Sequence, residues 1–203
     1  MTSRDLVVVT AGLSQPSSTR LLADRLSAAA VDQAGRAGVD LRVRVVELRD
    51  LAHDLMNHML TGFPPAPLRE VLDALAAADA LIAVTPVFHA SYSGLFKSFF
   101  DVLDKDVLDG KPVLIAATGG SARHSLALEH AVRPMFAYLR AVTVPTAVFA
   151  APEDWGGDET EGQLRRRAER AAAELAGEIA RREAARPVDP FALTTSFEDL
   201  LAG

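Results

Sequence analysis

Residues 6–19 read Leu6-Val7-Val8-Val9-Thr10-Ala11-Gly12-Leu13-Ser14-Gln15-Pro16-Ser17-Ser18-Thr19. The apolar, mostly β-branched run at the start is typical of a strand that is buried on both faces. Small and hydroxyl-bearing residues follow it, and from residue 19 to about residue 36 apolar residues recur at helical spacing. The stretch therefore predicts a strand, a loop rich in hydroxyl groups and a helix, in that order.

The same order recurs along the chain. Apolar runs predict strands at residues 6–10, 41–48, 80–85, 112–118 and 142–150. Helical spacing predicts helices at about 19–36, after Pro67, and at 93–104, 125–140 and 160–185, the last opening with a capping box of Thr160 and Gln163. This alternation favours an α/β fold with a doubly wound, five-stranded parallel sheet and helices on both faces. Residues 41–48 alternate valine with arginine, which predicts an edge strand with one wetter side.

Length and composition limit what such a chain can do. The 203 residues are 49% hydrophobic and 24% charged, as in ordinary globular domains, and none is cysteine. A disulfide framework, a thiolate nucleophile and Cys-ligated zinc or iron–sulfur centres are therefore excluded. The net charge of −6 argues against nucleic acid and against a strongly cationic membrane-binding surface.

A single domain is expected over residues 1–186, followed by a C-terminal tail over residues 187–203. The tail contains Phe191, Leu193 and Phe197, so we expect it to pack on its own domain or on a neighbouring subunit. Neither a signal peptide nor a run of about 20 apolar residues is found, which predicts a cytoplasmic protein without membrane contact.

The loop after the first strand is suited to a phosphate group. Free backbone amides and the helix dipole favour an anion at a helix N-terminus, and hydroxyl groups there can donate further hydrogen bonds. The hydroxyl groups belong to Ser14, Ser17, Ser18 and Thr19. An N-cap within a serine-rich turn is the alternative. Neither Walker nor Gly-x-Gly-x-x-Gly spacing is present, which favours a monophosphate held by neutral donors.

The loops after the third and fourth strands add two more features. Pro86 is expected to stop the third strand, and a flat heteroaromatic ring could lie against residues 86–88, unless Phe88 and Tyr92 simply cover the core. Gly119 and Gly120 allow a backbone to approach a ligand closely, although a plain tight turn explains them equally well in isolation. All three loops lie at the carboxyl ends of strands of one sheet, where such sheets bind ligands.

These motifs make the chain resemble the NADPH-dependent FMN reductase family, which has a flavodoxin-like fold. Residues 85–97, Thr-Pro-Val-Phe-His-Ala-Ser-Tyr-Ser-Gly-Leu-Phe-Lys, resemble the family pattern Thr-Pro-x-Tyr-x-x-Ser-x-x-Gly-x-x-Lys, and the match extends over most of residues 5–150. The chain looks closest to the actinobacterial branch whose members accompany luciferase-like flavin monooxygenases. It departs from many relatives in lacking an arginine in the first loop, where Gln15 stands, and in having Phe88 and His89 where tyrosine and asparagine are commoner.

The resemblance implies a set of FMN-binding residues. The phosphate group would lie against Ser14, Pro16, Ser17, Ser18 and Thr19, one edge of the isoalloxazine against Pro86, Val87, Phe88, His89 and Ser91, and its other edge against Thr118, Gly119, Gly120 and Ser121. Arg123 is a candidate for the 2′-phosphate of NADPH, while His124 is either a ligand contact or a surface or capping residue. No metal site and no essential acid or base is predicted.

The implied activity is hydride transfer from NADPH or NADH to N5 of FMN, which would supply reduced flavin to a monooxygenase. An FMN-retaining quinone or azo-dye reductase and a non-enzymatic, flavodoxin-type electron carrier remain as alternatives. A homodimer, or a dimer of dimers, is the family expectation, with the phenylalanine-rich helix at 93–104 as the predicted interface. A deeper core is the other explanation for those phenylalanines.

Overall fold

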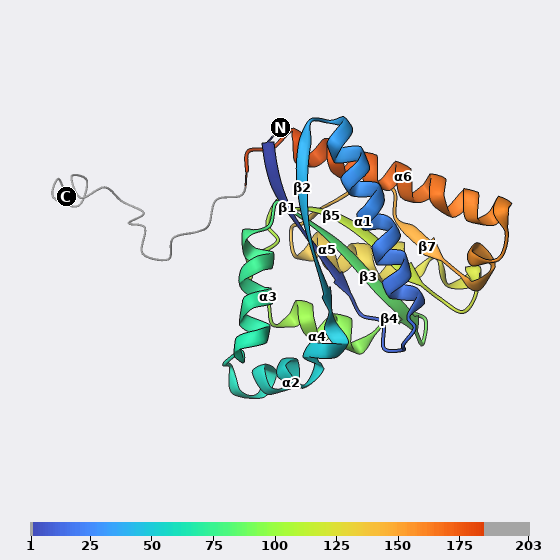
Figure 1. The fold of residues 1–203 in the computed structure, drawn as a ribbon. Coiled ribbons are helices and arrows are strands. Elements are labelled where there is room, and N and C mark those ends of the chain that lie inside the picture. The colour runs from blue at the N-terminus through green and yellow to red at the C-terminus, as the bar shows by residue number, and fades with distance from the viewer. Residues whose placement is uncertain (1, 185–203) are drawn as a thin grey trace.

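The computed structural model describes residues 2–184, without the side chains of residues 158 and 159. A twisted parallel sheet runs through its centre in the order β2-β1-β3-β5-β6, while β4 pairs with β3 and β7 with β5 (Figure 1). The strands are β1 (Thr2–Thr10), β2 (Val39–Glu47), β3 (Ala80–Phe88), β4 (Ser91–Tyr92), β5 (Pro112–Thr118), β6 (Val142–Thr143) and β7 (Val148–Ala150). This strand order is that of flavodoxin-like, doubly wound sheets. The predicted fold class is confirmed, and β2 lies at the edge as expected.

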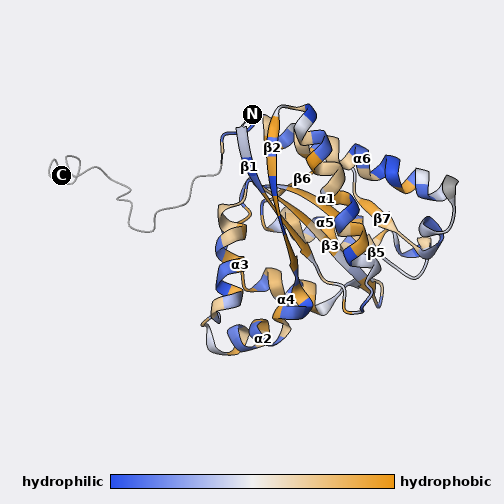
Figure 2. Cartoon of the chain, viewed as in Figure 1, coloured by the Kyte–Doolittle hydropathy of each residue, from blue (hydrophilic) through white to orange (hydrophobic). Residues whose placement is uncertain are grey.

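Helices cover both faces of the sheet. They are α1 (Ser18–Arg36), α2 (Ala52–Thr61), α3 (Ala66–Ala77), α4 (Gly94–Asp101), α5 (Arg133–Tyr138) and α6 (Asp158–Ala180). One core cluster joins the sheet to α1 and α6, and a second joins its other face to α3, α4 and α5. The central strands are accordingly hydrophobic over most of their length, β1 from Leu6 onward (Figure 2). The phenylalanines of α4 lie in this second cluster: Phe96, Phe99 and Phe100 are at most 3% exposed.

The predicted strand at 142–150 is two short strands. Pro145 cannot donate to a strand ladder, and the amide nitrogen and Oγ1 of Thr146 both donate to the Glu174 carboxylate of α6, at 2.7 Å each. The chain therefore leaves β5 after Thr143 and returns to it at Val148. The prediction that Pro86 stops the third strand is wrong, because β3 continues through Pro86 to Phe88. The fixed φ of proline suits an extended chain, and β4 pairs with the residues of β3 that follow Pro86.

The helix predicted at 125–140 is a composite. A 3-10 turn at Ala122–His124 and a π-helical turn at Leu128–Val132 precede α5. Pro134 lies in the first turn of α5 and has no amide hydrogen, so a regular α-helix cannot run through it unbroken.

Helices α2 and α6 also differ from the prediction. Helix α2 was not predicted, and Leu55 is its only buried residue. Helix α6 begins at Asp158 after Gly157, and Thr160 donates to the Gly157 carbonyl oxygen instead of forming a capping box. The same helix ends at Ala180, short of residue 185. The predicted tail at 187–203 lies outside the described residues. Among residues 2–184, no helix combines the length and the apolar character needed to cross a bilayer.

Candidate functional site

A cleft of about 390 Å³ opens at the carboxyl ends of the central strands. It begins beside β1 and β3, where the strand order reverses, which is the usual ligand position in doubly wound sheets. Loops after four strands line it. The lining residues are Leu13, Ser14, Ser18 and Thr19 after β1, Pro86, Val87 and Phe88 at the end of β3, Thr118, Gly119 and Gly120 after β5, and Pro152 after β7.

The first turn of α1 forms one end of the cleft. Ser17 is the N-cap, and its Oγ accepts a hydrogen bond from the Arg20 amide at 3.2 Å. The amides of Ser18 and Thr19 have no intrahelical acceptor, because the first turn of a helix provides none. Together with the exposed hydroxyls of Ser14 and Ser18, they can donate to an anion at the positive end of a 19-residue helix.

Two glycines keep the walls of this cleft close together. A Cβ on Gly12 would lie 2.0 Å from Ser17 Oγ, so only glycine allows the loop to turn back onto its own N-cap. A Cβ on Gly119 would lie 2.7 Å from Cζ of Phe149, which packs behind it. Gly120, in contrast, has open space around it on the cleft side. A planar ligand can thus approach the backbone after β5 closely.

A two-residue hairpin forms the opposite wall. Val87 pairs with Tyr92 and Phe88 with Ser91, so the chain reverses at His89 and Ala90, which have φ of 48° and 65°. Thr85 holds the base of the hairpin: its Oγ1 donates to the Pro86 carbonyl oxygen and accepts from the Ser93 amide. The Phe88 side chain, 44% exposed, borders the cleft and provides an apolar surface for a ring.

No charged side chain lines this cleft within the described part of the chain. Arg20 lies nearby, in a neighbouring hollow, but it pairs with Asp24 at 2.8 Å and with Glu47. The hydrogen bond to Asp24 is the largest cause that raises the pKa of Arg20. Its charge is therefore already compensated, and recognition of a ligand in the cleft depends on neutral donors and apolar contacts.

Most of the predicted site residues come together here, and some do not. Nine of them line the cleft: Ser14, Ser18, Thr19, Pro86, Val87, Phe88, Thr118, Gly119 and Gly120. Pro16 and Ser17 line the neighbouring hollow beside Arg20. The structure does not bring His89, Ser91 or Ser121 into the lining. His89 belongs to the hairpin turn, Ser91 pairs with Phe88 in β4, and Ser121 Oγ accepts from the Arg123 amide.

Leu13 and Pro152 line the cleft but were not predicted. Pro152 follows β7, so the rule that ligands lie beyond strand ends could have found it had the last strand been placed correctly. Leu13 lies inside the predicted loop, but an exposed leucine among hydroxyl-bearing residues carries no sequence signal for ligand contact.

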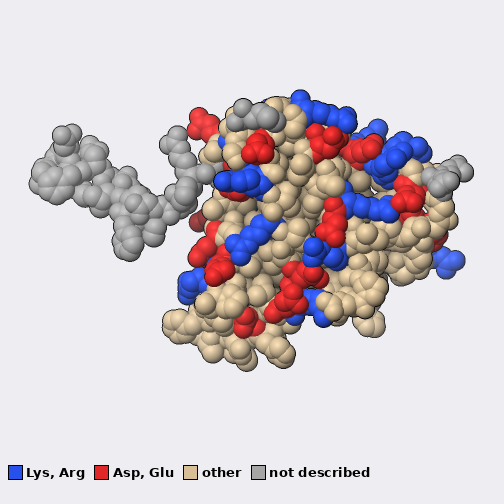
Figure 3. Space-filling model, in the orientation of Figure 1, with Lys and Arg blue, Asp and Glu red and all other residues tan. Residues whose placement is uncertain are grey.

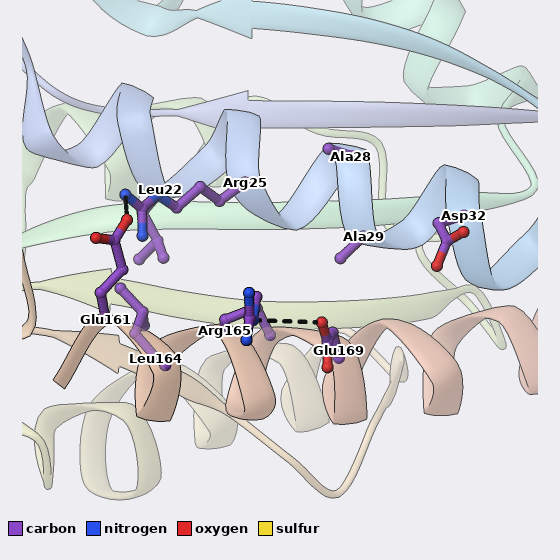
Figure 4. Close-up of a pocket in the computed structure, with 11 residues that line it drawn as sticks. Leu22, Arg25, Ala28, Ala29, Asp32, Glu161, Leu164, Arg165 and Glu169 are labelled. Carbon is purple, nitrogen blue, oxygen red and sulfur yellow. Dashed lines mark hydrogen bonds and ion pairs between the residues drawn. The ribbon is translucent and has the colours of Figure 1, made fainter. Parts of the chain in front are cut away.

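A larger hollow, of about 680 Å³, lies between α1 and α6 (Figure 4). Small side chains such as those of Ala28 and Ala29 leave space between the two helices there. Charged side chains at its rim form ion pairs, Arg25 with Glu161 at 2.6 Å and Arg165 with Glu169 at 3.8 Å. Acidic and basic residues alternate across this face of the molecule (Figure 3). The described lining of this hollow comes from α1 and α6 and includes no residue of the loops that follow β1, β3 and β5, so the cleft is the better candidate site.

Comparison with known proteins shows which family the chain resembles. The sequence profile of a family described as NADPH-dependent FMN reductase matches residues 5–156. The chain is 38% identical to an FMN reductase (NADPH) of Pseudomonas aeruginosa, over 82% of this chain and 90% of that protein. It is 37% identical to the NADH-dependent FMN reductase SfnF of Pseudomonas fluorescens, over 82% of this chain and 89% of that protein. The X-ray structure of an oxidoreductase from Corynebacterium diphtheriae matches with a TM-score of 0.87 and 51% identity, covering 90% of this chain and 100% of that one.

Proposed function

This chain belongs to the NADPH-dependent FMN reductase family, and we propose that the cleft beyond β1, β3 and β5 is where it binds FMN. As a member of the family it is an NAD(P)H-dependent FMN oxidoreductase. The observation that carries the proposal is that one cleft, with no charged side chain in its described lining, joins a helix N-terminus with hydroxyl donors to a slot between Phe88 and Gly120. FMN has the complementary parts, a monophosphate and a planar ring.

The residues of the first loop would hold the phosphate group. Ser14 and Ser18 donate from exposed hydroxyls, and the amides of Ser18 and Thr19 donate from the backbone. Thr19 also shares a hydrogen bond with Thr118, which fixes the first turn of α1 against the end of β5. The first loop lacks the arginine that many relatives have, and neutral donors in a fixed arrangement would bind the phosphate dianion in its place.

The hairpin and the glycine loop would orient the ring. Bound FMN supplies the atom that accepts the hydride of the nicotinamide, so the reaction requires no catalytic acid or base from the protein. Phe88 covers one part of the slot, and Gly119 and Gly120 leave room for a ring against the backbone. The contribution of this chain is position and partial exclusion of water.

The function is tested by following oxidation of NADPH and NADH with and without added FMN. We expect fast oxidation only with FMN. We also expect Ser18→Ala to weaken FMN binding by about tenfold while leaving riboflavin binding unchanged, because riboflavin lacks the phosphate and a hydrogen bond to a charged group is worth about 1.5–3 kcal/mol. Ser3→Ala, an exposed serine at the other end of β1, is the matched control. If Ser18→Ala weakened the binding of FMN and of riboflavin equally, the assignment of Ser18 to the phosphate group would be contradicted.

The proposal extends to the fate of the electrons. We infer that reduced flavin leaves the protein and serves a flavin-dependent monooxygenase, because the cleft offers a ligand no charged anchor. A cytoplasmic location is part of this proposal, since the reductant is a cytoplasmic metabolite. Loss of FMN on gel filtration, with activity restored by adding it back, is expected. Retention of yellow FMN together with fast quinone turnover would instead support a quinone or azo reductase.

A homodimer is also proposed, through α2 and not through the phenylalanine-rich helix that the sequence predicted as the interface. The phenylalanines of α4 are buried in the core of their own chain, whereas Met56, Met59 and Leu60 of α2 are exposed, Leu60 by 85%. Leu60→Glu is expected to convert the dimer to a monomer in light scattering. An unchanged mass for this variant would remove α2 from the interface.

A further inference from the structure

A second hollow, of about 320 Å³, lies beside the FMN cleft. The two have no lining residue in common, but residues close in the chain line them: Phe88 borders the cleft and Ala90 the hollow, and Gly120 borders the cleft and Arg123 the hollow. The π-helical turn that forms the floor of the hollow packs against β4. A ligand that places one end on a ring in the cleft can therefore reach the hollow with its other end.

The polar lining of this hollow is basic. Its polar side chains are Arg123, His124 and His130, all exposed, and the rest of the lining is alanine and leucine. Within residues 2–184 the Arg123 guanidinium makes no hydrogen bond or ion pair, unlike Arg20, Arg25 and Arg133, which all have carboxylate partners. The nearest acidic residue along the turn, Glu129, is engaged by Arg133 at 2.6 and 2.9 Å.

This set of donors matches a phosphate dianion. A guanidinium presents two parallel N–H groups that fit two phosphate oxygens, and imidazole nitrogens can donate to others. His130 interacts electrostatically with Glu129, so among the described residues Arg123 is the basic group of the hollow that has no charged partner. The described lining of the cleft contains no charged residue, so FMN itself does not need this arginine. Of the two reductants, only NADPH carries a 2′-phosphate, a terminal dianion at the end of the molecule remote from its nicotinamide.

Resting on the proposed function, we propose that the hollow formed by Arg123, His124 and His130 binds the 2′-phosphate of NADPH and makes this chain prefer NADPH to NADH. Overall similarity leaves this choice open, because the relatives named for NADPH and for NADH are 38% and 37% identical to the chain. The positive charge of Arg123 in the hollow favours NADPH over NADH.

The test compares Arg123→Gln with the wild type. We expect the KM for NADPH to rise by about tenfold and the KM for NADH and both kcat values to change little, since one charge-assisted hydrogen bond is lost. Arg166→Gln is the matched control, an exposed arginine of α6 outside both the cleft and the hollow. An equal rise in KM for both nucleotides, or none for either, would overturn the assignment.

A binding experiment separates this inference from the proposed function. Calorimetry on the protein without FMN compares adenosine 2′,5′-bisphosphate with adenosine 5′-monophosphate. We expect the bisphosphate to bind the wild type about tenfold more tightly and Arg123→Gln to lose that difference. A wild-type protein that does not discriminate between the two probes overturns the phosphate site even if FMN reduction is fast. Discrimination without FMN reduction would leave the site intact and contradict the proposed function.

Discussion

The Oγ1 atoms of Thr19 and Thr118 lie 2.8 Å apart and share a hydrogen bond, although 99 residues separate them in the chain. Both side chains are buried, one in the first turn of α1 and the other at the end of β5. The bond joins the wall that would hold the phosphate group to the wall that would border the ring. This pair of hydroxyl groups therefore ties the two walls together directly, in addition to the packing of α1 on the sheet.

Thr118→Val is expected to lower the free energy of unfolding by about 1–2 kcal/mol, because the Thr19 hydroxyl is left buried without its partner. It should also weaken FMN binding several-fold, since the first turn of α1 is no longer fixed. Chemical denaturation and a fluorescence titration with FMN measure the two effects. Thr118→Ser keeps a hydroxyl and should restore most of both losses. If Thr118→Val were as stable as the wild type, the hydrogen bond between Thr19 and Thr118 would not contribute to stability.

Gly119→Ala is expected to destabilise the protein by about 1–3 kcal/mol, because the new Cβ would clash with the Phe149 ring 2.7 Å away. The double variant with Phe149→Leu should recover part of the loss, since leucine lacks the ring atom that clashes. Gly120→Ala is the control and should fold normally, as nothing lies near its added methyl group. Thermal unfolding of the four proteins decides the matter. Equal stability of the two single variants would contradict the clash.

Ala90→Gly is expected to stabilise the protein by about 0.5–1 kcal/mol. Ala90 has a φ of 65° in a two-residue hairpin turn, a conformation that costs an L-residue about 1–2 kcal/mol and costs glycine much less. Ala173→Gly, at an exposed position inside α6, should instead cost about 1 kcal/mol. The opposite signs separate the effect of the turn from a general effect of glycine. A loss of stability in Ala90→Gly would show that the turn carries no such strain.

Lys111 provides a test at high pH. Its Nζ donates to the carbonyl oxygens of Leu75, Ala76 and Ala78 at the end of α3, and burial lowers the pKa of this side chain to about 8. The unfolded chain has a lysine pKa near 10.4, so between about pH 8 and pH 10 the unfolded state binds more protons and this group makes stability rise with pH.

Lys111→Met should be less stable than the wild type by about 1–3 kcal/mol at pH 7.5, because three buried carbonyl groups lose their donor. The difference should widen by on the order of 1 kcal/mol between pH 8 and pH 10, since only the wild type has this titrating group. Urea denaturation at both pH values measures it. A difference that narrows with rising pH would contradict the depressed pKa.

Much of this protein could be predicted from sequence because local patterns decided it. Continuous apolar runs identify strands buried on both faces, as at residues 80–85 and 112–118, and the valine–arginine alternation in β2 marks an edge strand. The loops that line the cleft were found by one rule, that ligands lie beyond the strand ends. Errors came where a residue acts through a distant partner, as when Glu174 of α6 draws Thr146 out of the last strand.

The sequence by itself thus determined the layered α/β fold, the loops after β1, β3 and β5, and the neutral chemistry of the phosphate donors. Only the tertiary structure decided which hydroxyls share a hydrogen bond and that the phenylalanines of α4 are in the core. It also decided that Arg20 has carboxylate partners, whereas the Arg123 guanidinium has none within residues 2–184. The physical reason is that secondary structure follows from spacing within a few residues. A site depends on which side chains the packing brings together and which charges their neighbours have already compensated.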